Sequence, residues 1–165
     1  MSGHQPIVCE VRVRPSAGGL TLNLTGRDPK ERIMHPILNT IDIVVSDMDA
    51  SIAFYARLGL TFKLDEHSPE HAGCDLPNGL HVMLDTEGFR TPFLPGWSAP
   101  TGGPRTLLCF EFEGPAGVDA TYAELVAAGY QGIAEPFDAF WGMRYATVAD
   151  PDGNGVDLYA ALPAR

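Results

Sequence analysis

The chain has 165 residues, a length typical of a single domain, and 45% of them are hydrophobic, enough for a buried core. Its 21 acidic against 11 basic residues give a formal net charge of −10, which argues against DNA, RNA or an anionic membrane surface as a partner. Cys9, Cys74 and Cys109 form no CxxC pair and no Cys/His cluster, so neither a disulfide framework nor a structural zinc site is predicted. No apolar run is long enough for a signal sequence or a membrane helix, and we expect a cytoplasmic protein.

Residues 1–33 form a segment of their own. Val8–Arg14 and Leu20–Thr25 alternate apolar and polar residues around the turn formers of Pro15–Gly19. This pattern is compatible with a β-hairpin arm. There are two alternatives to the hairpin: the segment is disordered, or the chain starts at Met34.

An internal repeat organises the rest of the chain. The letters DASIA, starting at Asp49, recur as DATYA from Asp119, an offset of 70 residues, and Gly59 and Gly129 follow at the same offset. Asp47 or Asp49 suits the start of a helix in the first copy, and the two glycines suit helix ends. Each copy therefore predicts one amphipathic helix, whose apolar stripe is Met48, Ile52 and Tyr55 in the first and Val118, Tyr122 and Leu125 in the second.

Strand-like runs precede and follow each helix. In the first half they are Ile37–Ser46, Leu60–Glu66, a weaker Ala72–Leu76, and Gly79–Thr86; in the second they are Arg105–Glu113, Gly132–Pro136, Met143–Ala149 and Gly155–Ala161. Turn signals stand at Pro77–Gly79 and at Asp150–Gly155. The pattern predicts an α+β fold of two βαβββ modules, residues 34–86 and 105–165. Residues 87–104 are rich in Gly and Pro and are predicted to be a long connection without an element of its own.

Alternation along the strands separates two faces of the predicted sheet. One face is wholly apolar and should lie under the helices; it comprises Ile41, Ile43, Val45, Leu80, Val82, Leu84, Leu108, Phe110, Phe112, Val156 and Leu158. The other face is mixed and should either be solvated or line a cavity. Its residues are Thr40, Asp42, Val44, His81, Met83, Leu107, Cys109, Glu111, Asp157 and Tyr159.

Two segments carry a resemblance to a known family. Val44–Tyr55, followed by Leu58–Leu60, resembles the first βα unit of the vicinal oxygen chelate superfamily, which includes glyoxalase I, extradiol dioxygenases and bleomycin-resistance proteins. Asp150–Asn154 with Val156–Tyr159 resembles its closing turn and last strand, so that the likeness covers about residues 35–162. The resemblance implies that the modules pair into a cupped, mostly antiparallel sheet with the helices on the outer face.

Enzymes of this superfamily usually hold a divalent metal in the cup through His, Gln or Glu. Those positions correspond here to Thr40, His81 or Met83, Leu107 and Asp157. Leu and Met are not useful ligands for such a metal and Thr is a poor one, so at most His81 and Asp157 remain where three ligands are needed. We therefore expect no metal and no cofactor, and the prediction leans against an enzyme.

A finer resemblance concerns the drug-binding branch of the superfamily. Ala139–Ala146 is similar to the Trp-Gly-x-Arg-aromatic strand of bleomycin- and mitomycin-resistance proteins, in which the Trp and nearby aromatic rings stack on the drug. Trp97–Gly103, Tyr122–Val126 and Ala128–Tyr130 resemble the mitomycin-binding type. This likeness implies a homodimer that binds and sequesters an aromatic or polycyclic natural product without chemistry.

The candidate ligand-binding residues follow from the mixed face and these segments. Trp141 and Trp97 are the expected stacking rings. Phe137, Phe140, Tyr145 and Tyr159 either extend that wall or pack in the core. Asp42, Glu111 and Asp157 favour a planar ligand that is neutral or cationic, unless Arg144 and Arg105 neutralise two of them. His81 is a hydrogen-bonding candidate, Thr40 lies on the same face, and Cys109 is expected to be a small apolar filler rather than a nucleophile.

Two other functions remain open from the sequence. An enzyme of the same fold, a lyase, an isomerase or a dioxygenase-like member, could act on a natural-product intermediate with Asp42, Glu111, Asp157 or His81 as general base. Alternatively, the segment 1–33 could dock a partner by strand addition.

Overall fold

The computed structural model describes residues 37–94, 96–103 and 105–163, and the predicted hairpin arm lies outside them. The first module contains β1 (Thr40–Val45), α1 (Met48–Arg57), β2 (Lys63–Leu64), β3 (His71–Asp75) and β4 (His81–Thr86). A short helix, α2 (Glu87–Arg90), follows. The second module contains β5 (Leu108–Glu111), α3 (Pro115–Ala127), β6 (Gly132–Asp138), β7 (Met143–Ala149) and β8 (Gly155–Ala161).

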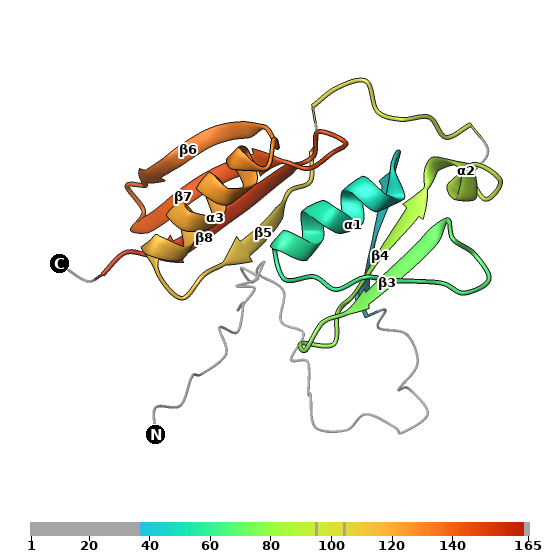
Figure 1. Ribbon diagram of the computed structural model, residues 1–165, viewed down its shortest axis with the longest axis horizontal. Helices are drawn as coiled ribbons and strands as arrows, with labels where there is room; N and C mark the ends of the chain where they lie inside the picture. Colours follow the sequence, from blue (N-terminus) through green and yellow to red (C-terminus); the bar gives the residue numbers. More distant parts are fainter. Residues whose placement is uncertain (1–36, 95, 104, 164–165) are drawn as a thin grey trace, which may run out of the picture. The chain divides into compact units, whose positions relative to one another are not determined.

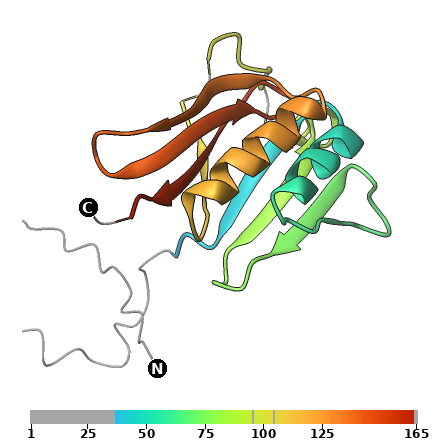
Figure 2. The same cartoon turned by 60° about the vertical axis from the view of Figure 1, so that its left-hand side comes forward.

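Each module is a four-stranded sheet with its helix on one face (Figures 1 and 2). The strand order is β1-β4-β3-β2 in the first sheet and β5-β8-β7-β6 in the second. In both, the first and last strands of the module pair in parallel and the other neighbours are antiparallel. The predicted α+β fold of two βαβββ modules is therefore confirmed, with the strands divided between two mixed sheets.

Local side-chain chemistry sets the limits of α1. The Asp47 carboxylate accepts a hydrogen bond from the backbone N–H of Ala50 at 2.9 Å, which caps the first turn. Gly59 follows the helix with φ of +84°, a left-handed conformation that glycine adopts without a steric penalty. Both positions were predicted from the sequence.

The prediction that alternate strand residues form an apolar face under the helices is also confirmed. Val45, Val82, Leu84, Val156 and Leu158 are buried, and they pack with residues of the two helix stripes. The core adds Phe54, fully buried on α1 next to the predicted stripe.

Four elements differ clearly from the sequence predictions, and one of them is the strand predicted over Arg105–Glu113, which is only Leu108–Glu111. The strand predicted over Leu60–Glu66 is only Lys63–Leu64, because the Asp65 carboxylate accepts hydrogen bonds from the backbone of His67 and Ser68 and turns the chain. The weak run near Ala72 is a five-residue strand, β3. The connection 87–104 begins with a helix, α2, since the Thr86 hydroxyl accepts from the N–H of Phe89 at 3.2 Å and caps it.

Side chains of the two modules meet around α1. The Tyr55 hydroxyl donates a buried hydrogen bond to Asp150 Oδ2 at 2.9 Å, in the turn that joins β7 to β8. Arg57 forms an exposed ion pair with Glu124 of α3 at 2.7 Å. The predicted turn at Asp150 is thus both a β-hairpin connection and an anchor for α1.

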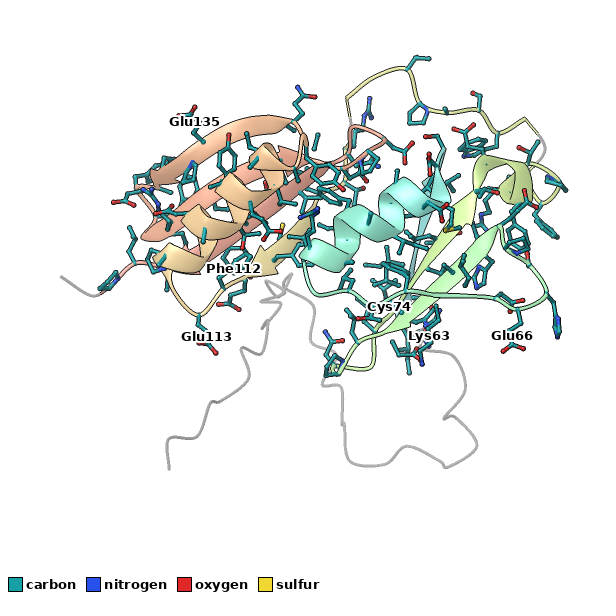
Figure 3. The ribbon with its side chains drawn as sticks, viewed as in Figure 1. Lys63, Glu66, Cys74, Phe112, Glu113 and Glu135 are labelled. Atoms are coloured by element: carbon teal, nitrogen blue, oxygen red, sulfur yellow. The ribbon has the colours of Figure 1, made fainter. Side chains whose placement is uncertain are left out.

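The acidic excess lies mainly on the outside of the described chain. Glu66, Glu113 and Glu135 are exposed and project from the ribbon, whereas Cys74 is buried in the first module (Figure 3). Among the described residues, no helix has the length and apolar character that crossing a membrane requires.

Candidate functional site

A row of side chains crosses the second sheet on the face opposite α3. The strand registers place Glu111 beside Tyr159, Tyr159 beside Tyr145, and Tyr145 beside Phe137. The rings of Tyr145 and Tyr159 are stacked with centroids 6.4 Å apart, and those of Phe137 and Tyr145 are 6.1 Å apart. Four residues that are distant in sequence therefore form a continuous strip with a carboxylate at one end.

Two further rings extend this strip beyond the sheet. Trp141, in the turn between β6 and β7, meets Phe137, Phe140 and Tyr145 edge to face, with centroid distances of 6.4, 4.8 and 5.9 Å. Phe140 is 97% exposed, Trp141 52% and Phe137 41%. Side chains of this size gain free energy when apolar area is covered, so an exposed cluster of them is a typical binding surface. We call Phe137, Phe140, Trp141, Tyr145 and Tyr159 the aromatic strip.

Asp157 lies next to the strip, and both of its carboxylate oxygens accept hydrogen bonds from side chains of the second module. One carboxylate oxygen accepts from the Tyr145 hydroxyl at 2.5 Å, and the other accepts from Thr147 Oγ1 at 2.7 Å. Burial, with the hydrogen bond to Asp157, raises the pKa of the Tyr145 phenol well above its usual value. Cys109 Sγ lies 3.7 Å from the same carboxylate; burial and the negative charge of Asp157 raise the pKa of the Cys109 thiol, which makes it a poor nucleophile at neutral pH.

Arg144 does not neutralise an acid of the mixed face, which was one of the alternatives. Arg144 pairs with Asp119 at 2.8 Å and with Asp138 at 2.9 Å, rather than with Glu111 or Asp157. The reason is register: Arg144 is one residue from Tyr145 on β7 and so points to the side of α3. This alternative is therefore wrong for Arg144.

A second group of polar residues lies on the first sheet, on the face opposite α1. Asp42 of β1 and Asp85 of β4 share the guanidinium of Arg90 from α2, at 2.5 and 3.6 Å. Asp85, only 1% exposed, also contacts His71 Nδ1 at 2.6 Å. Burial and the nearby Asp85 carboxylate raise the pKa of Asp42, although Arg90 and His71 oppose the shift. We call Asp42, Asp85, Arg90 and His71 the acid–arginine network.

Three members of this network were missed by sequence reasoning. Asp85 continues the alternation of His81 and Met83 along β4, so extending the mixed face by two residues could have found it. His71 lies on the weakest predicted strand, and Arg90 lies in the Gly- and Pro-rich connection; neither carried a local signal.

The structure brings Asp42 and Trp97 together at a cavity of about 380 Å³. Its other lining residues include Val44, Glu87 and Asn154. A neighbouring cavity of about 450 Å³ shares Pro100, Thr106 and Asn154 with it and reaches Arg105, so hollow space continues beneath the connection. Trp97 is half-buried there and does not belong to the aromatic strip.

His81 and Thr40 lie apart from both groups. His81 Nδ1 contacts Asp75 Oδ1 at 2.6 Å, and its ring lies over Gly73, where an added Cβ would come within 2.9 Å of His81 Cε1. The Thr40 hydroxyl donates to Asn39 at 3.2 Å. His81 thus behaves as a hydrogen-bonded strand histidine.

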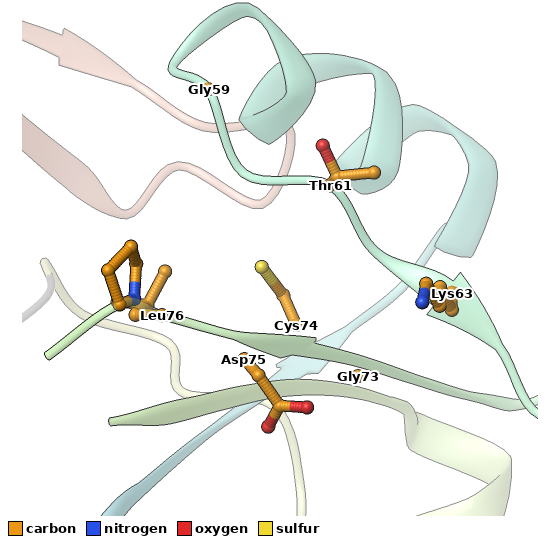
Figure 4. A pocket seen from close by; sticks show the side chains of 8 residues that line it. Gly59, Thr61, Lys63, Gly73, Cys74, Asp75 and Leu76 are labelled. Carbon is orange, nitrogen blue, oxygen red and sulfur yellow. The ribbon is translucent and has the colours of Figure 1, made fainter. Parts of the chain in front are cut away.

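A further cavity of about 310 Å³ lies between the end of α1, β2 and β3 (Figure 4). The Cys74 sulfur points toward the segment that contains Thr61. None of the candidate ligand-binding residues lines it.

The donor set does not fit the metal centre typical of the predicted superfamily. Leu107 offers no donor atom, and both oxygens of Asp157 accept hydrogen bonds from hydroxyl groups. Within residues 37–94, 96–103 and 105–163, no group of three or more His, Cys, Asp or Glu side chains is placed to hold a metal ion. We therefore derive no chemistry through a metal here.

Comparisons with known proteins identify the family. The model of the Glyoxalase/Bleomycin resistance protein/Dioxygenase superfamily matches residues 37–158, and the chain belongs to this superfamily. The comparison with curated proteins gave no match.

Solved structures share the fold at low sequence identity. A glyoxalase/bleomycin resistance protein/dioxygenase family enzyme from Burkholderia phytofirmans is similar with a TM-score of 0.65 and 24% identity, over 76% of this chain and 98% of that one. A hypothetical protein from S. aureus has a TM-score of 0.68 and 18% identity, over 81% and 100%. A glyoxalase-related enzyme from Fulvimarina pelagi has a TM-score of 0.64 and 21% identity, over 75% and 87%. At these identities the likeness supports the fold alone.

Proposed function

We propose that the protein binds and sequesters a planar aromatic or polycyclic natural product, neutral or cationic, without converting it. The proposal includes membership of the mitomycin- and bleomycin-type branch and a homodimeric state. The observation that supports it best is the aromatic strip, whose most exposed rings, Phe140 and Trp141, stand beside the tyrosine pair of the sheet. Each aromatic contact with a ligand adds about 0.5–1.5 kcal/mol beyond the area that it buries.

Charge supports the same class of ligand. Glu111 is exposed at the end of the strip, next to Tyr159, whose phenol pKa is raised first by burial and then by the negative charge of Glu111. A cationic group of a stacked ligand could pair with this carboxylate, whereas an anionic group would be repelled.

Tryptophan fluorescence tests this function directly, because the chain has only two tryptophans. Mitomycin C and bleomycin serve as probes, and we expect one of them to quench the W97F variant, in which Trp141 is the reporter. W141F should lose this quenching, and W141A should bind about tenfold more weakly, as the loss of about 1.4 kcal/mol implies. At one hundred times its Kd the ligand should stabilise the protein by about 2.7 kcal/mol and be recovered with unchanged mass.

A different result would exclude the proposal. Quenching that persists in W141F, or stoichiometric recovery of a modified ligand, would show that the strip is not a sequestration site. The second outcome would favour the alternative function, an enzyme of the same fold acting on a natural-product intermediate. Sedimentation equilibrium tests the homodimer separately.

A further inference from the structure

The guanidinium of Arg90 forms ion pairs with two carboxylates of the first sheet. Asp42 and Asp85 lie on neighbouring strands, on the same face of the first sheet, and Arg90 reaches them from α2. Asp85 also has His71 as an ion-pair partner, whereas the ion pair of Asp42 in this network is with Arg90. The arrangement is that of a receptor for a flat cation with several N–H donors.

The fit between Arg90 and Asp42 is imperfect. Although an ion pair joins them at 2.5 Å, neither oxygen of Asp42 nor Nε of Arg90 has a well-directed hydrogen bond among the described residues, and these atoms are buried. Buried polar atoms in this state cost free energy. A cation that can place its N–H groups more freely than a side chain tethered to α2 could satisfy them better.

The surroundings offer room for the rest of such a ligand. The cavity of about 380 Å³ that touches Asp42 is also lined by Trp97 and Glu87. Trp97 can stack on an aromatic ring, and the partly exposed Glu87 adds negative potential. The helix that carries Arg90 has only four residues and starts the long connection, so moving Arg90 aside disturbs no strand.

We propose that Asp42 and Asp85 form a binding site for the amidinium or guanidinium group of an aromatic ligand, which Arg90 occupies in its absence and which the Trp97 cavity completes. The ligand cation replaces the Arg90 guanidinium, and no covalent step is involved. The cavity also takes lining residues from the second module, among them Leu108 and Asn154, but none from the aromatic strip.

Chemical rescue of R90A tests the site, with methylguanidinium and benzamidinium as probes. R90A removes the cation that pairs with the carboxylates of Asp42 and Asp85, so the Tm of this variant should fall. Millimolar benzamidinium should restore the Tm. Sodium chloride at the same concentration should not. Benzamidinium should bind R90A about tenfold more tightly than the unchanged protein, in which Arg90 competes from within the chain. Methylguanidinium should also rescue R90A, but more weakly, and W97A should remove the advantage of the aromatic probe.

Matched controls separate this site from general effects. R57A removes an exposed arginine that is also ion-paired with a carboxylate, and its Tm should respond to benzamidinium no more than that of the unchanged protein. The double variant D42N/R90A should lose the rescue. If R90A does not fold, R90K replaces it, because lysine keeps the charge and lacks the planar fork; it should bind benzamidinium more tightly than the unchanged protein.

The proposal fails if benzamidinium has no more effect than sodium chloride on R90A or R90K. It fails equally if benzamidinium raises the Tm of D42N/R90A by the same amount as that of R90A, since the probe would then act elsewhere. If neither mitomycin C nor bleomycin binds but benzamidinium acts on R90A as expected, the proposed function is contradicted and the proposal for this site is supported.

Discussion

Asp157 occupies a position at which enzymes of the superfamily place a metal-binding carboxylate, and here hydroxyl groups hold both of its oxygens. Tyr145 and Thr147 come from the adjacent strand β7 and fix the carboxylate in a buried position. The charge of Asp157 is thereby used to orient Tyr145 in the aromatic strip. A residue type shared with metal sites thus serves a different purpose in this chain.

Replacing Asp157 should reveal this role. D157A removes the acceptor of two short hydrogen bonds and should lower the free energy of unfolding by about 2–4 kcal/mol, measured by urea denaturation. D157N keeps a carbonyl acceptor and should cost less. Because the carboxylate contributes to the raised pKa of Tyr145, phenolate absorbance should show this pKa falling in D157N; an unchanged pKa would contradict the assignment.

Asp42 gives a prediction for the dependence of stability on pH. Burial and Asp85 raise its pKa in the folded protein above the unfolded value of about 3.9, so the folded state keeps a proton that the unfolded state has released. The free energy of unfolding of the unchanged protein, relative to D42N, should therefore fall as pH rises from about 4 through the folded pKa, by at most about 1.4 kcal/mol per pH unit.

Urea denaturation of both proteins between about pH 3 and pH 8 measures this difference. The charged or titratable groups around Asp42 are Asp85, His71, Arg90 and Glu87, and they are present in both proteins, so the comparison reduces their direct contributions. A relative stability that rises with pH would mean that Arg90 outweighs burial.

At the scale of the element, the two main helices begin in different ways. Asp47 caps α1 with its side chain, whereas α3 starts after Gly114 with Pro115 at its first turn and has no side-chain cap. Proline fits that place because the N–H it lacks would have no partner within the helix. The start of α1 therefore depends on a single side chain.

Asp47→Ala should lower the free energy of unfolding by about 1 kcal/mol, since the N–H of Ala50 loses its acceptor. Asp47→Asn retains an acceptor of similar geometry and should stay within a few tenths of a kcal/mol of the unchanged protein. Thermal and urea unfolding measure both. Equal losses in the two variants would indicate that charge, rather than capping, is what matters there.

The elements also show what local sequence could predict. The bounds of β7 and β8, the α1 cap and the Asp150 turn were predicted correctly, because alternation, Asp and Gly each act within a few residues. The helix α2 was not, since four residues carry no helical period. The acid–arginine network was missed for a further reason: it joins β1, β3, β4 and α2, and only the folded chain brings them together.

At the scale of the whole molecule, the polar contacts between the modules differ in burial. Tyr55 and Asp150 are buried together, while the ion pair of Arg57 with Glu124 is exposed to solvent. Burial and the carboxylate of Asp150 raise the pKa of the Tyr55 phenol, so its hydroxyl remains a donor across the working pH range.

Tyr55→Phe should therefore cost about 1–3 kcal/mol of unfolding free energy, because a hydrogen bond to a charged acceptor is lost from a buried place. Arg57→Ala removes a solvent-screened pair and the contact of the guanidinium with the Tyr130 ring, and it should cost less than about 1 kcal/mol. Chemical denaturation compares the two variants. A larger loss for Arg57→Ala would show that the exposed pair, and not the buried hydrogen bond, holds the modules together.

An aromatic wall that extends from Trp141 was one of two alternatives given by the sequence, but the order of the rings along it was not predicted. Phe137, Tyr145 and Tyr159 share it because of the register of three strands, and register depends on pairing over distances that the sequence pattern does not encode. Trp97 lines the cavity at Asp42, and its place in one cup with Trp141 stays a prediction.

The repeated strand order has an evolutionary consequence. The offset of 70 residues between DASIA and DATYA, together with two sheets of identical topology, indicates an ancestral duplication of one βαβββ unit. After such an event each copy can change while the other maintains the framework. Here the free face of the first copy carries acids, and that of the second carries aromatic rings, so the two copies differ in the chemistry of the same face.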